Sequence, residues 1–186
     1  MSNDFSHEEV ERILTAKVHL RQKFTGSVIP TWLTFAPLDQ MFVTGGAIAS
    51  LLQLEDPNDY DVYCKNKIDL FSFVDILTRD FKENVADINQ MYREFVDQDG
   101  KMITENAITM DNKISFIRVS VGEPKDVRKT FDYTHCLPYY DIVQNKLYIS
   151  REQYGACVSK VLVVNNASMI KRYREEKFLE RGYIKC

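Results

Sequence analysis

The stretch from Phe42 to Cys64, FVTGGAIASLLQLEDPNDYDVYC, constrains the fold more than any other part of the chain. Two adjacent glycines, Gly45 and Gly46, separate an apolar segment from a run that is typical of a helix. Glycine lets the backbone adopt positive φ and approach a ligand closely, and the free N–H groups that begin a helix attract anions. We therefore predict a strand at 41–44, a helix at 47–54 and an anion site at the turn. A plain turn is the alternative for two glycines considered alone.

The same stretch ends on two aspartates that are separated by one residue. Residues 55–58 include a proline and break the helix, so 60–64 is predicted to be a strand. Asp59 and Asp61 then place their carboxylates on one face, while Tyr60 and Val62 point toward the core. The two carboxylates repel each other, and a shared divalent cation with hard-oxygen preference relieves that repulsion. A solvated strand end is the alternative for this pair alone.

The joint spacing of the glycines and aspartates is more informative than either pair. It places an anion cradle beside a metal site, as metal-assisted phosphoryl transfer requires. The segment GGAIASLLQLEDPNDYDV resembles the nucleotidyltransferase superfamily, with its DNA polymerase β-like fold, and most of all its tRNA CCA-adding enzymes and bacterial poly(A) polymerases. The resemblance implies that Gly45 and Gly46 hold a nucleoside triphosphate (NTP) and that Asp59 and Asp61 bind Mg²⁺ or Mn²⁺.

The chain departs from that branch in the helix after the glycines. The branch usually carries Arg-Asp a few residues after them, where this chain has Ala49-Ser50. Nor does a serine directly follow the first glycine, as it does in the Gly-Ser form of the motif. We therefore expect Ser50, Thr44 or backbone N–H groups to contact the phosphates instead.

Many members of the superfamily use a third carboxylate from a later strand. Asp132, in a predicted strand at 130–135, is the best candidate for this third metal ligand and catalytic residue, ahead of Asp111 and Asp141. Its surroundings, SFIRVSVGEPKDVRKTFDYTHCLPYYD, resemble a stretch of uncharacterised nucleotidyltransferase-like proteins of large tailed bacteriophages, as does EEKFLERGY at 175–183. The resemblance thus spans most of residues 41–183 and suggests a phage origin.

Several polar and aromatic side chains follow Asp132 closely. His135 is a candidate acid, base or polar contact near phosphates, with a half-buried strand histidine as the alternative. Tyr133, Tyr139 and Tyr140 are candidates for stacking on a base. The alternative for these rings is a place in the core or on the surface of a strand.

The C-terminal run KRYREEKFLERGYIKC, in a helix predicted at 168–181, supplies the basic candidates. Lys171, Arg174 and Lys177 recur at helical spacing on one side. We predict that they bind the triphosphate or the backbone of an RNA acceptor. A solvated amphipathic helix with its apolar residues packed inward is the alternative.

Apolar periodicity predicts the remaining elements. Helices are expected at 6–24, 70–81 and 154–164, and strands at 107–110, 114–121 and 147–150, while 85–100 is ambiguous. The mixture predicts an α+β fold, with a small mixed sheet flanked by helices and further C-terminal helices. We expect one domain, made of an N-terminal helix and connector (1–40), a core (41–150) and a packed helical segment (151–186).

Composition excludes several classes of protein. With 45% hydrophobic residues the chain of 186 residues can build a core, and a net charge of −3 argues against a dedicated nucleic-acid coat protein. The four cysteines form no C-x-x-C, so neither a disulfide framework nor a zinc site is expected. No segment resembles a signal peptide or a membrane span. We therefore expect a cytoplasmic location, in the host cytoplasm if a phage encodes the chain.

These observations predict a metal-dependent nucleotidyltransferase that moves a nucleotidyl group from an NTP to an acceptor hydroxyl. RNA or tRNA is the acceptor that the resemblance suggests; the sequence sets neither the acceptor nor the oligomeric state. The main alternative is a catalytically weak or inactive member that binds nucleic acid or a protein. A phosphodiesterase-type hydrolase fits less well, because such enzymes assemble several His and Asp ligands and only His135 stands near the candidate site.

Overall fold

The computed structural model describes residues 5–81, 107–110 and 112–185. Its strands are β1 (Met41–Thr44), β2 (Tyr60–Cys64), β3 (Ala107–Thr109), β4 (Ile114–Ile117), β5 (Tyr139–Asp141), β6 (Lys146–Tyr148), β7 (Val161–Leu162) and β8 (Ile184–Lys185). Its α-helices are α1 (His7–Thr25), α2 (Gly46–Leu52), α3 (Lys67–Asp80), α5 (Pro124–Val127), α6 (Arg151–Val158) and α7 (Arg172–Glu180). Short 3-10 helices are η1 (Thr31–Phe35), η2 (Leu38–Gln40), η4 (Arg128–Thr130), η5 (Thr134–Cys136) and η6 (Ala167–Met169).

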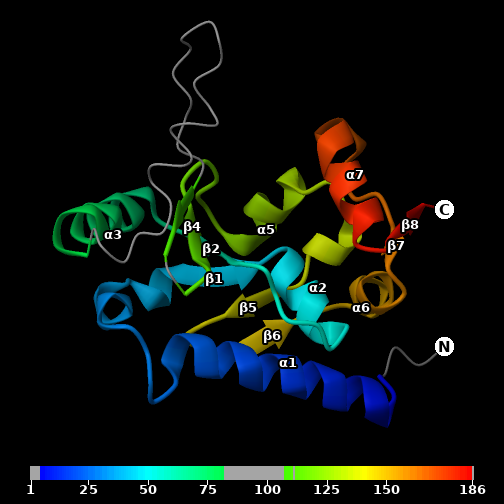
Figure 1. The fold of residues 1–186 in the computed structure, drawn as a ribbon, viewed down its shortest axis with the longest axis horizontal. Helices are drawn as coiled ribbons and strands as arrows, with labels where there is room; N and C mark the ends of the chain where they lie inside the picture. The colour runs from blue at the N-terminus through cyan, green and yellow to red at the C-terminus, as the bar shows by residue number, and fades with distance from the viewer. Residues whose placement is uncertain (1–4, 82–106, 111, 186) are drawn as a thin grey trace, which may run out of the picture.

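One mixed sheet organises the described residues (Figure 1). Its strand order is β3-β4-β2-β1-β5-β6, and β7 pairs with β8 separately. Strand β2 runs parallel to β4, and the other neighbours in the large sheet are antiparallel. The predicted α+β fold, with a small mixed sheet flanked by helices, is confirmed.

The long helix α1 begins at a capping box. The Ser6 hydroxyl accepts a hydrogen bond from the Glu9 N–H, and the Glu9 carboxylate accepts one from the Ser6 N–H. The buried residues Ala16, Leu20 and Phe24 pack into the main core. Helix α1 runs along one side of the sheet, and α5 lies on the other (Figure 1).

The two faces of β1 and β2 belong to different clusters. Val43, Tyr60 and Val62 lie in the main core with α1 and α2, whereas Phe42 and Tyr63 pack with Val127 of α5. Because side chains alternate along a strand, Asp61 shares the α5 side with Tyr63. The predicted alternation, with Tyr60 and Val62 inward and Asp61 on the opposite face, is confirmed.

The C-terminal helix α7 docks through a third cluster. Phe178 of α7 and Tyr183 pack against Tyr133, Cys136 and Leu162. This contact holds α7 beside the turn η5, above the edge of the sheet where β1 ends and β2 begins (Figure 1). Its basic side chains therefore reach the residues that follow β1.

Several predicted elements are wrong in type or in extent. Residues 130–135 form no strand: they run from the end of η4 into η5, with a single β-bridge between Tyr133 and Val164. Their backbone bonds the loop 163–166, where the Thr134 N–H donates to Val163 O at 2.8 Å and the Asn165 N–H donates to Asp132 O at 2.7 Å. The predicted helix 154–164 instead spans 151–158, and β7 follows it. Helix α7 begins at 172, not 168. The ambiguous residues 85–100 lie outside the described ranges.

Cys64, Cys136 and Cys157 are buried free thiols, and Cys186 lies outside the described residues. In the described parts of the chain, no helix combines the length and the apolar character that crossing a membrane requires.

Candidate functional site

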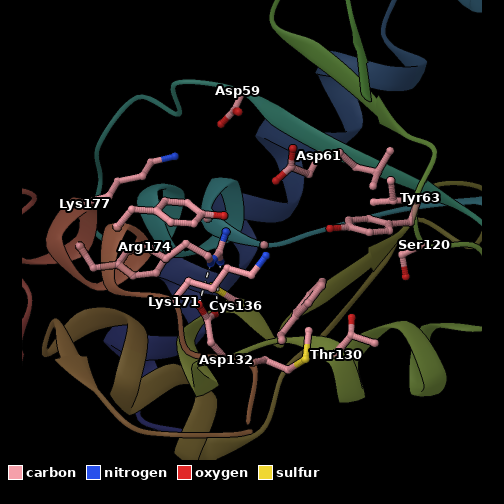
Figure 2. Close-up of a pocket in the computed structure, with 18 of the residues that line it drawn as sticks. Asp59, Asp61, Tyr63, Ser120, Thr130, Asp132, Cys136, Lys171, Arg174 and Lys177 are labelled. Carbon is pink, nitrogen blue, oxygen red and sulfur yellow. Dashed lines mark hydrogen bonds and ion pairs between the residues drawn. The ribbon is translucent and has the colours of Figure 1, made fainter. Parts of the chain in front are cut away.

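A cavity of about 260 Å³ brings together most of the predicted site residues. Because β1 and β2 are antiparallel, the end of β1 and the start of β2 meet at one edge of the sheet. Helix α7 lies across that edge (Figure 2). The predicted residues that line the cavity are Gly45, Gly46, Asp59, Asp61, Asp132, Lys171, Arg174 and Lys177.

Gly45 is required at its position for two reasons. Its φ of +90° is strained for any residue with a side chain, and a Cβ there would stand 3.3 Å from Asp61 Oδ2. The Gly45 N–H donates to Cys136 O at 3.1 Å, which fixes the turn against η5. The glycine therefore keeps the backbone close to the Asp61 carboxylate and leaves the space in front of it open.

The two aspartates face the cavity with unbalanced charge. Burial, together with the charge of Asp59, raises the pKa of Asp61 from 3.8 to about 7, against the opposing charges of Lys177 and Arg174. Among the described residues, neither carboxylate forms a hydrogen bond or an ion pair. A carboxylate pair in this state suits a divalent cation.

The donor set fits a cation that phosphates share. Within the described residues, no three His, Cys, Asp or Glu side chains come together as a metal site. The protein thus offers two carboxylates, Asp59 and Asp61, at this position. Mg²⁺ is usually held by one or two carboxylates together with substrate phosphates and water, so the pair matches Mg²⁺ or Mn²⁺ beside a triphosphate.

Helix α7 provides a basic wall opposite the aspartates. Lys171, Arg174 and Lys177 point into the space in front of Asp59 and Asp61 (Figure 2). Arg181, which the site prediction omitted, also lines the cavity, and a Cβ on Gly46 would lie 3.9 Å from its Nη1. Its spacing of four residues from Lys177 is the sequence signal that places it on the same helix side.

Asp132 lies in the cavity wall but is bound to Arg174. It is 2% exposed, and the Arg174 guanidinium donates from Nε to Oδ2 at 2.6 Å and from Nη2 to Oδ1 at 3.2 Å. The Tyr133 N–H also donates to Oδ1. Bidentate pairs of this kind are strong and directional. The role of Asp132 as a third metal ligand stays a prediction, and it would require Asp132 to release Arg174.

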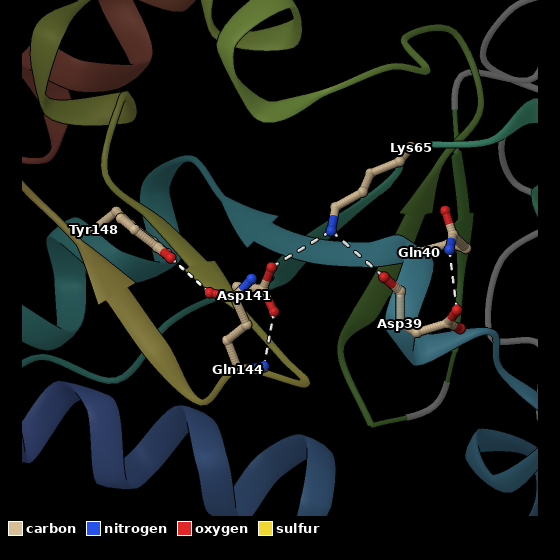
Figure 3. Close-up of polar contacts among 6 residues, drawn as sticks. All are labelled: Asp39, Gln40, Lys65, Asp141, Gln144 and Tyr148. Atoms are coloured by element: carbon tan, nitrogen blue, oxygen red, sulfur yellow. Dashed lines mark hydrogen bonds and ion pairs between the residues drawn. The ribbon is translucent and has the colours of Figure 1, made fainter.

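Of the two rivals for the third carboxylate, only Asp141 lies within the described residues, and it is not among the residues that line the cavity. Asp141, on β5, accepts hydrogen bonds from Lys65 Nζ at 3.4 Å and from the Gln144 N–H at 2.9 Å (Figure 3). Its carboxylate is thereby engaged in a structural contact. Asp111 lies outside the described residues.

The two side chains expected to replace the missing Arg-Asp do not line the cavity. The buried Thr44 hydroxyl donates to Cys136 O at 3.0 Å and to Pro138 O at 2.8 Å. Ser50 lies one turn into α2 and is not among the residues that line the cavity. Among side chains, the phosphate contacts available at this site therefore come from α7 and the residues that flank it, and contact through backbone N–H groups stays a prediction.

The aromatic candidates near Asp132 divide into core and surface groups. Tyr133 is buried and its hydroxyl donates to Glu175 at 3.2 Å. Tyr140 is buried and donates to Asn145 at 2.9 Å. Only Tyr139, of the three, keeps a partly exposed ring.

His135 is a core residue in a turn, not a half-buried strand histidine. Its ring contacts Phe178 and Tyr183, with centroids 4.5 and 4.4 Å away. Both ring nitrogens are buried and lack a hydrogen-bond partner. Burial lowers the pKa of His135 to about 4; the charge of Asp132 opposes this shift and those of Arg174 and Arg181 add to it.

We expect this histidine to make the fold acid-sensitive. Its folded pKa of about 4 lies below the ordinary 6.5, so its contribution to stability is complete above pH 6.5 and is lost as the pH falls toward 4. His135→Phe should remove about 2 kcal/mol of the stability difference between pH 7 and pH 5. Urea unfolding at both pH values measures it, with the exposed His7→Gln as the control. Parallel pH profiles for wild type and His135→Phe would contradict this account.

Two solved structures share this fold at low sequence identity. The Thermotoga maritima CCA-adding enzyme complexed with tRNA is 15% identical, with a TM-score of 0.53 over 91% of this chain and 42% of that one. A CCA-adding enzyme in its apo form I is 13% identical, with a TM-score of 0.53 over 93% of this chain and 42% of that one. The chain thus spans less than half the length of these enzymes, and the likeness establishes a nucleotidyltransferase-like fold.

Sequence comparison places the chain in a family. No curated protein matches it. A family model described as Gabija anti-defense 2 family protein matches residues 15–160, which is well over half of the chain. The chain therefore belongs to the Gabija anti-defense 2 family.

Proposed function

We propose that the protein binds an NTP together with Mg²⁺ or Mn²⁺ and transfers a nucleotidyl group to an acceptor hydroxyl. One observation carries the proposal: two unpaired carboxylates, Asp59 and Asp61, face the basic wall Lys171, Arg174 and Lys177 across one small cavity. The nucleotidyltransferase-like fold supports it. The family description names a biological role and no chemistry, so the proposed reaction rests on the cavity.

The residues that line the cavity would have different roles in such a reaction. Asp59 and Asp61 would hold the cation, which neutralises phosphate charge and activates the attacking oxygen when bound. Lys171 and Lys177 would pair with the phosphates of the nucleotide, as compact charges on flexible stems. The close turn at Gly45 leaves space for the nucleotide beside Asp61.

Arg174 would bind phosphate from a fixed position. Asp132 engages two of its nitrogens, and a guanidinium has five N–H donors. The remaining donors are therefore free to bind an anion while the side chain is held in place. In this role Asp132 contributes by orienting Arg174, and preorganised donors of this kind stabilise developing charge effectively.

A binding module without transfer activity is the second candidate. It is favoured by the absence, among the described residues, of a group of three metal-ligating side chains, and by the ion pair that engages Asp132. A protein of this kind would still bind nucleic acid or a protein partner on the same surface. The two candidates differ in whether a metal-dependent nucleotide site is present.

A thermal-shift screen of the four NTPs, with Mg²⁺ or Mn²⁺ and without either, tests the proposal. Ligand binding to the folded state raises the unfolding midpoint, by RT ln(1 + [L]/Kd) in free energy. We expect a metal-dependent rise in the wild type that disappears in the Asp59→Ala/Asp61→Ala double variant. The double variant Asp39→Ala/Asp75→Ala, outside the cavity, is the matched control. Absence of any shift in the wild type would favour the binding module.

A further inference from the structure

A pair of tyrosines stacks on the α5 side of the sheet, away from the cavity. Tyr139 on β5 and Tyr148 on β6 are partners in register, and their ring centroids lie 4.5 Å apart with planes inclined by 5°. The Tyr148 hydroxyl donates to Gln144 Oε1 at 2.7 Å (Figure 3). Both rings are partly exposed, so the edge of the sheet presents a fixed aromatic surface.

Two cations complete this surface, which we call the tyrosine platform (Arg128, Tyr139, Lys146 and Tyr148). Arg128 Cζ lies 5.1 Å from the centroid of the Tyr139 ring, and Lys146 Nζ lies 4.6 Å from that of Tyr148. Lys146 is exposed. Its ammonium can therefore move off the face of the Tyr148 ring, so that another planar group can stack there, and still lie close to that group.

Arg128 is a half-buried cation that has no polar partner among the described residues. Its Nε is buried without a hydrogen bond, and its guanidinium forms no hydrogen bond or ion pair within the described residues. Leaving a buried donor unpaired is costly, and an anion held there would satisfy it. The carboxylates of Asp126 and Asp141 already pair with Lys129 and Lys65.

The platform is joined to the candidate active site. The Phe42 ring contacts both Tyr139 and Tyr63, with centroid distances of 6.1 and 5.8 Å, and Tyr63 lines the cavity. Arg128 begins η4, whose last residue, Thr130, also lines the cavity. The platform and the cavity therefore lie on the same side of the sheet and share the Phe42 cluster.

We propose that the tyrosine platform binds single-stranded nucleic acid, as the acceptor whose reactive end enters the cavity. Bases stack on aromatic rings whatever their sequence, and phosphates pair with neighbouring cations. Here a base stacks on Tyr148, and Arg128 and Lys146 pair with the flanking phosphates. The role of this nucleic acid as an acceptor rests on the proposed function. Its binding at the platform does not depend on any transfer reaction.

Fluorescence anisotropy with labelled 12-nucleotide oligo(U) and oligo(dT) tests the platform in the full chain. We expect Tyr148→Ala to weaken binding about tenfold, as loss of one stacked base does, and Tyr148→Phe to retain it. Arg128→Gln should also lower the slope of log K against log salt by about 0.7. The matched controls are Phe35→Ala, an exposed ring packed on Phe81, and Arg79→Gln, an exposed arginine on α3; both should bind as the wild type does.

The same variants separate this inference from the proposed function. Weakened oligonucleotide binding in Tyr148→Ala and Arg128→Gln, with the NTP-dependent thermal shift intact, supports the platform as the acceptor site. If oligonucleotides bind through the platform but no NTP produces a shift, the platform stands and only the transfer reaction fails. Platform variants that bind as tightly as Phe35→Ala, or a wild type that binds neither oligomer, would overturn the inference and favour a protein ligand for this surface.

Discussion

Asp61→Asn is expected to stabilise the free protein and to abolish its metal-dependent nucleotide binding. The pKa of Asp61 is raised from 3.8 to about 7, so the folded state holds this proton more tightly than the unfolded state does. Stability therefore falls as the pH rises from about 4 to 7, and at pH 8 the ionised carboxylate costs on the order of 3 kcal/mol. Asparagine carries no charge, so the unfolding midpoint should rise by roughly 5 °C or more.

Differential scanning fluorimetry at pH 8, with and without Mg²⁺ and an NTP, measures both effects. Asp59→Asn is the matched control for stability, because Asp59 is exposed and its replacement should change the midpoint much less. Both variants should lose the metal-dependent shift. An Asp61→Asn protein that keeps this shift, or keeps full transfer activity, would remove Asp61 from the metal site.

Arg174→Ala is expected to be the most destabilising single change in the cavity wall. The substitution leaves the buried carboxylate of Asp132, which is 2% exposed, without its cationic partner. Removing one partner of a buried pair typically costs about 3–5 kcal/mol, and we expect the unfolding midpoint to fall by roughly 10 °C. The double variant Asp132→Leu/Arg174→Met should recover much of the loss, because apolar residues can replace a buried pair at little cost.

Urea unfolding of the wild type, Asp132→Leu, Arg174→Met and the double variant forms the cycle that isolates this pair, and Arg174→Ala is measured beside it. Arg172→Ala is the matched control. Arg172 is exposed and pairs with Glu176 four residues away on α7, a contact worth about 0.5 kcal/mol. If Arg174→Ala is no less stable than Arg172→Ala, the pair does not hold α7 in place, and Asp132 is available for another role.

The part of the fold around the glycines was predictable because its signals are local. Strand β1 at 41–44 and strand β2 at 60–64 have the predicted bounds, since an apolar run, a glycine pair and a proline-containing break define them. The S-x-x-Q pattern from Ser150 to Gln153 also forms a capping box. This signal locates the start of α6 at residue 151 better than apolar periodicity does.

The errors lie where distant segments compete for the backbone. Residues 130–135 are rich in β-formers, yet their hydrogen bonds go to the loop 163–166, a partner that no local pattern names. Strand β5 was missed, since its three residues Tyr139–Asp141 owe their conformation to pairing with β1 and β6. Helix α6 ends early because Val161 and Leu162 pair with β8, more than 20 residues away in the chain.

In the candidate site, too, local spacing was predictable and contacts between distant residues were not. The i, i+2 spacing of Asp59 and Asp61 and the i, i+3 spacing of Lys171, Arg174 and Lys177 predicted which side chains share a face, and all five line one cavity. The ion pair between Asp132 and Arg174 was not predicted, because it joins residues 42 positions apart. Nor does any sequence signal reveal that Thr44 turns its hydroxyl to Cys136 O and Pro138 O.

We propose that Asp59 and Asp61 hold a divalent cation and that the triphosphate lies against α7. The most direct test is a crystal grown with Mn²⁺ and a non-hydrolysable NTP analogue, examined at the manganese absorption edge. The account predicts an anomalous peak bridging Asp59 and Asp61, with triphosphate density beside Lys171, Arg174 and Lys177. Ordered triphosphate elsewhere on the protein, or a cavity that holds neither metal nor phosphate at saturating concentrations of both, would contradict it.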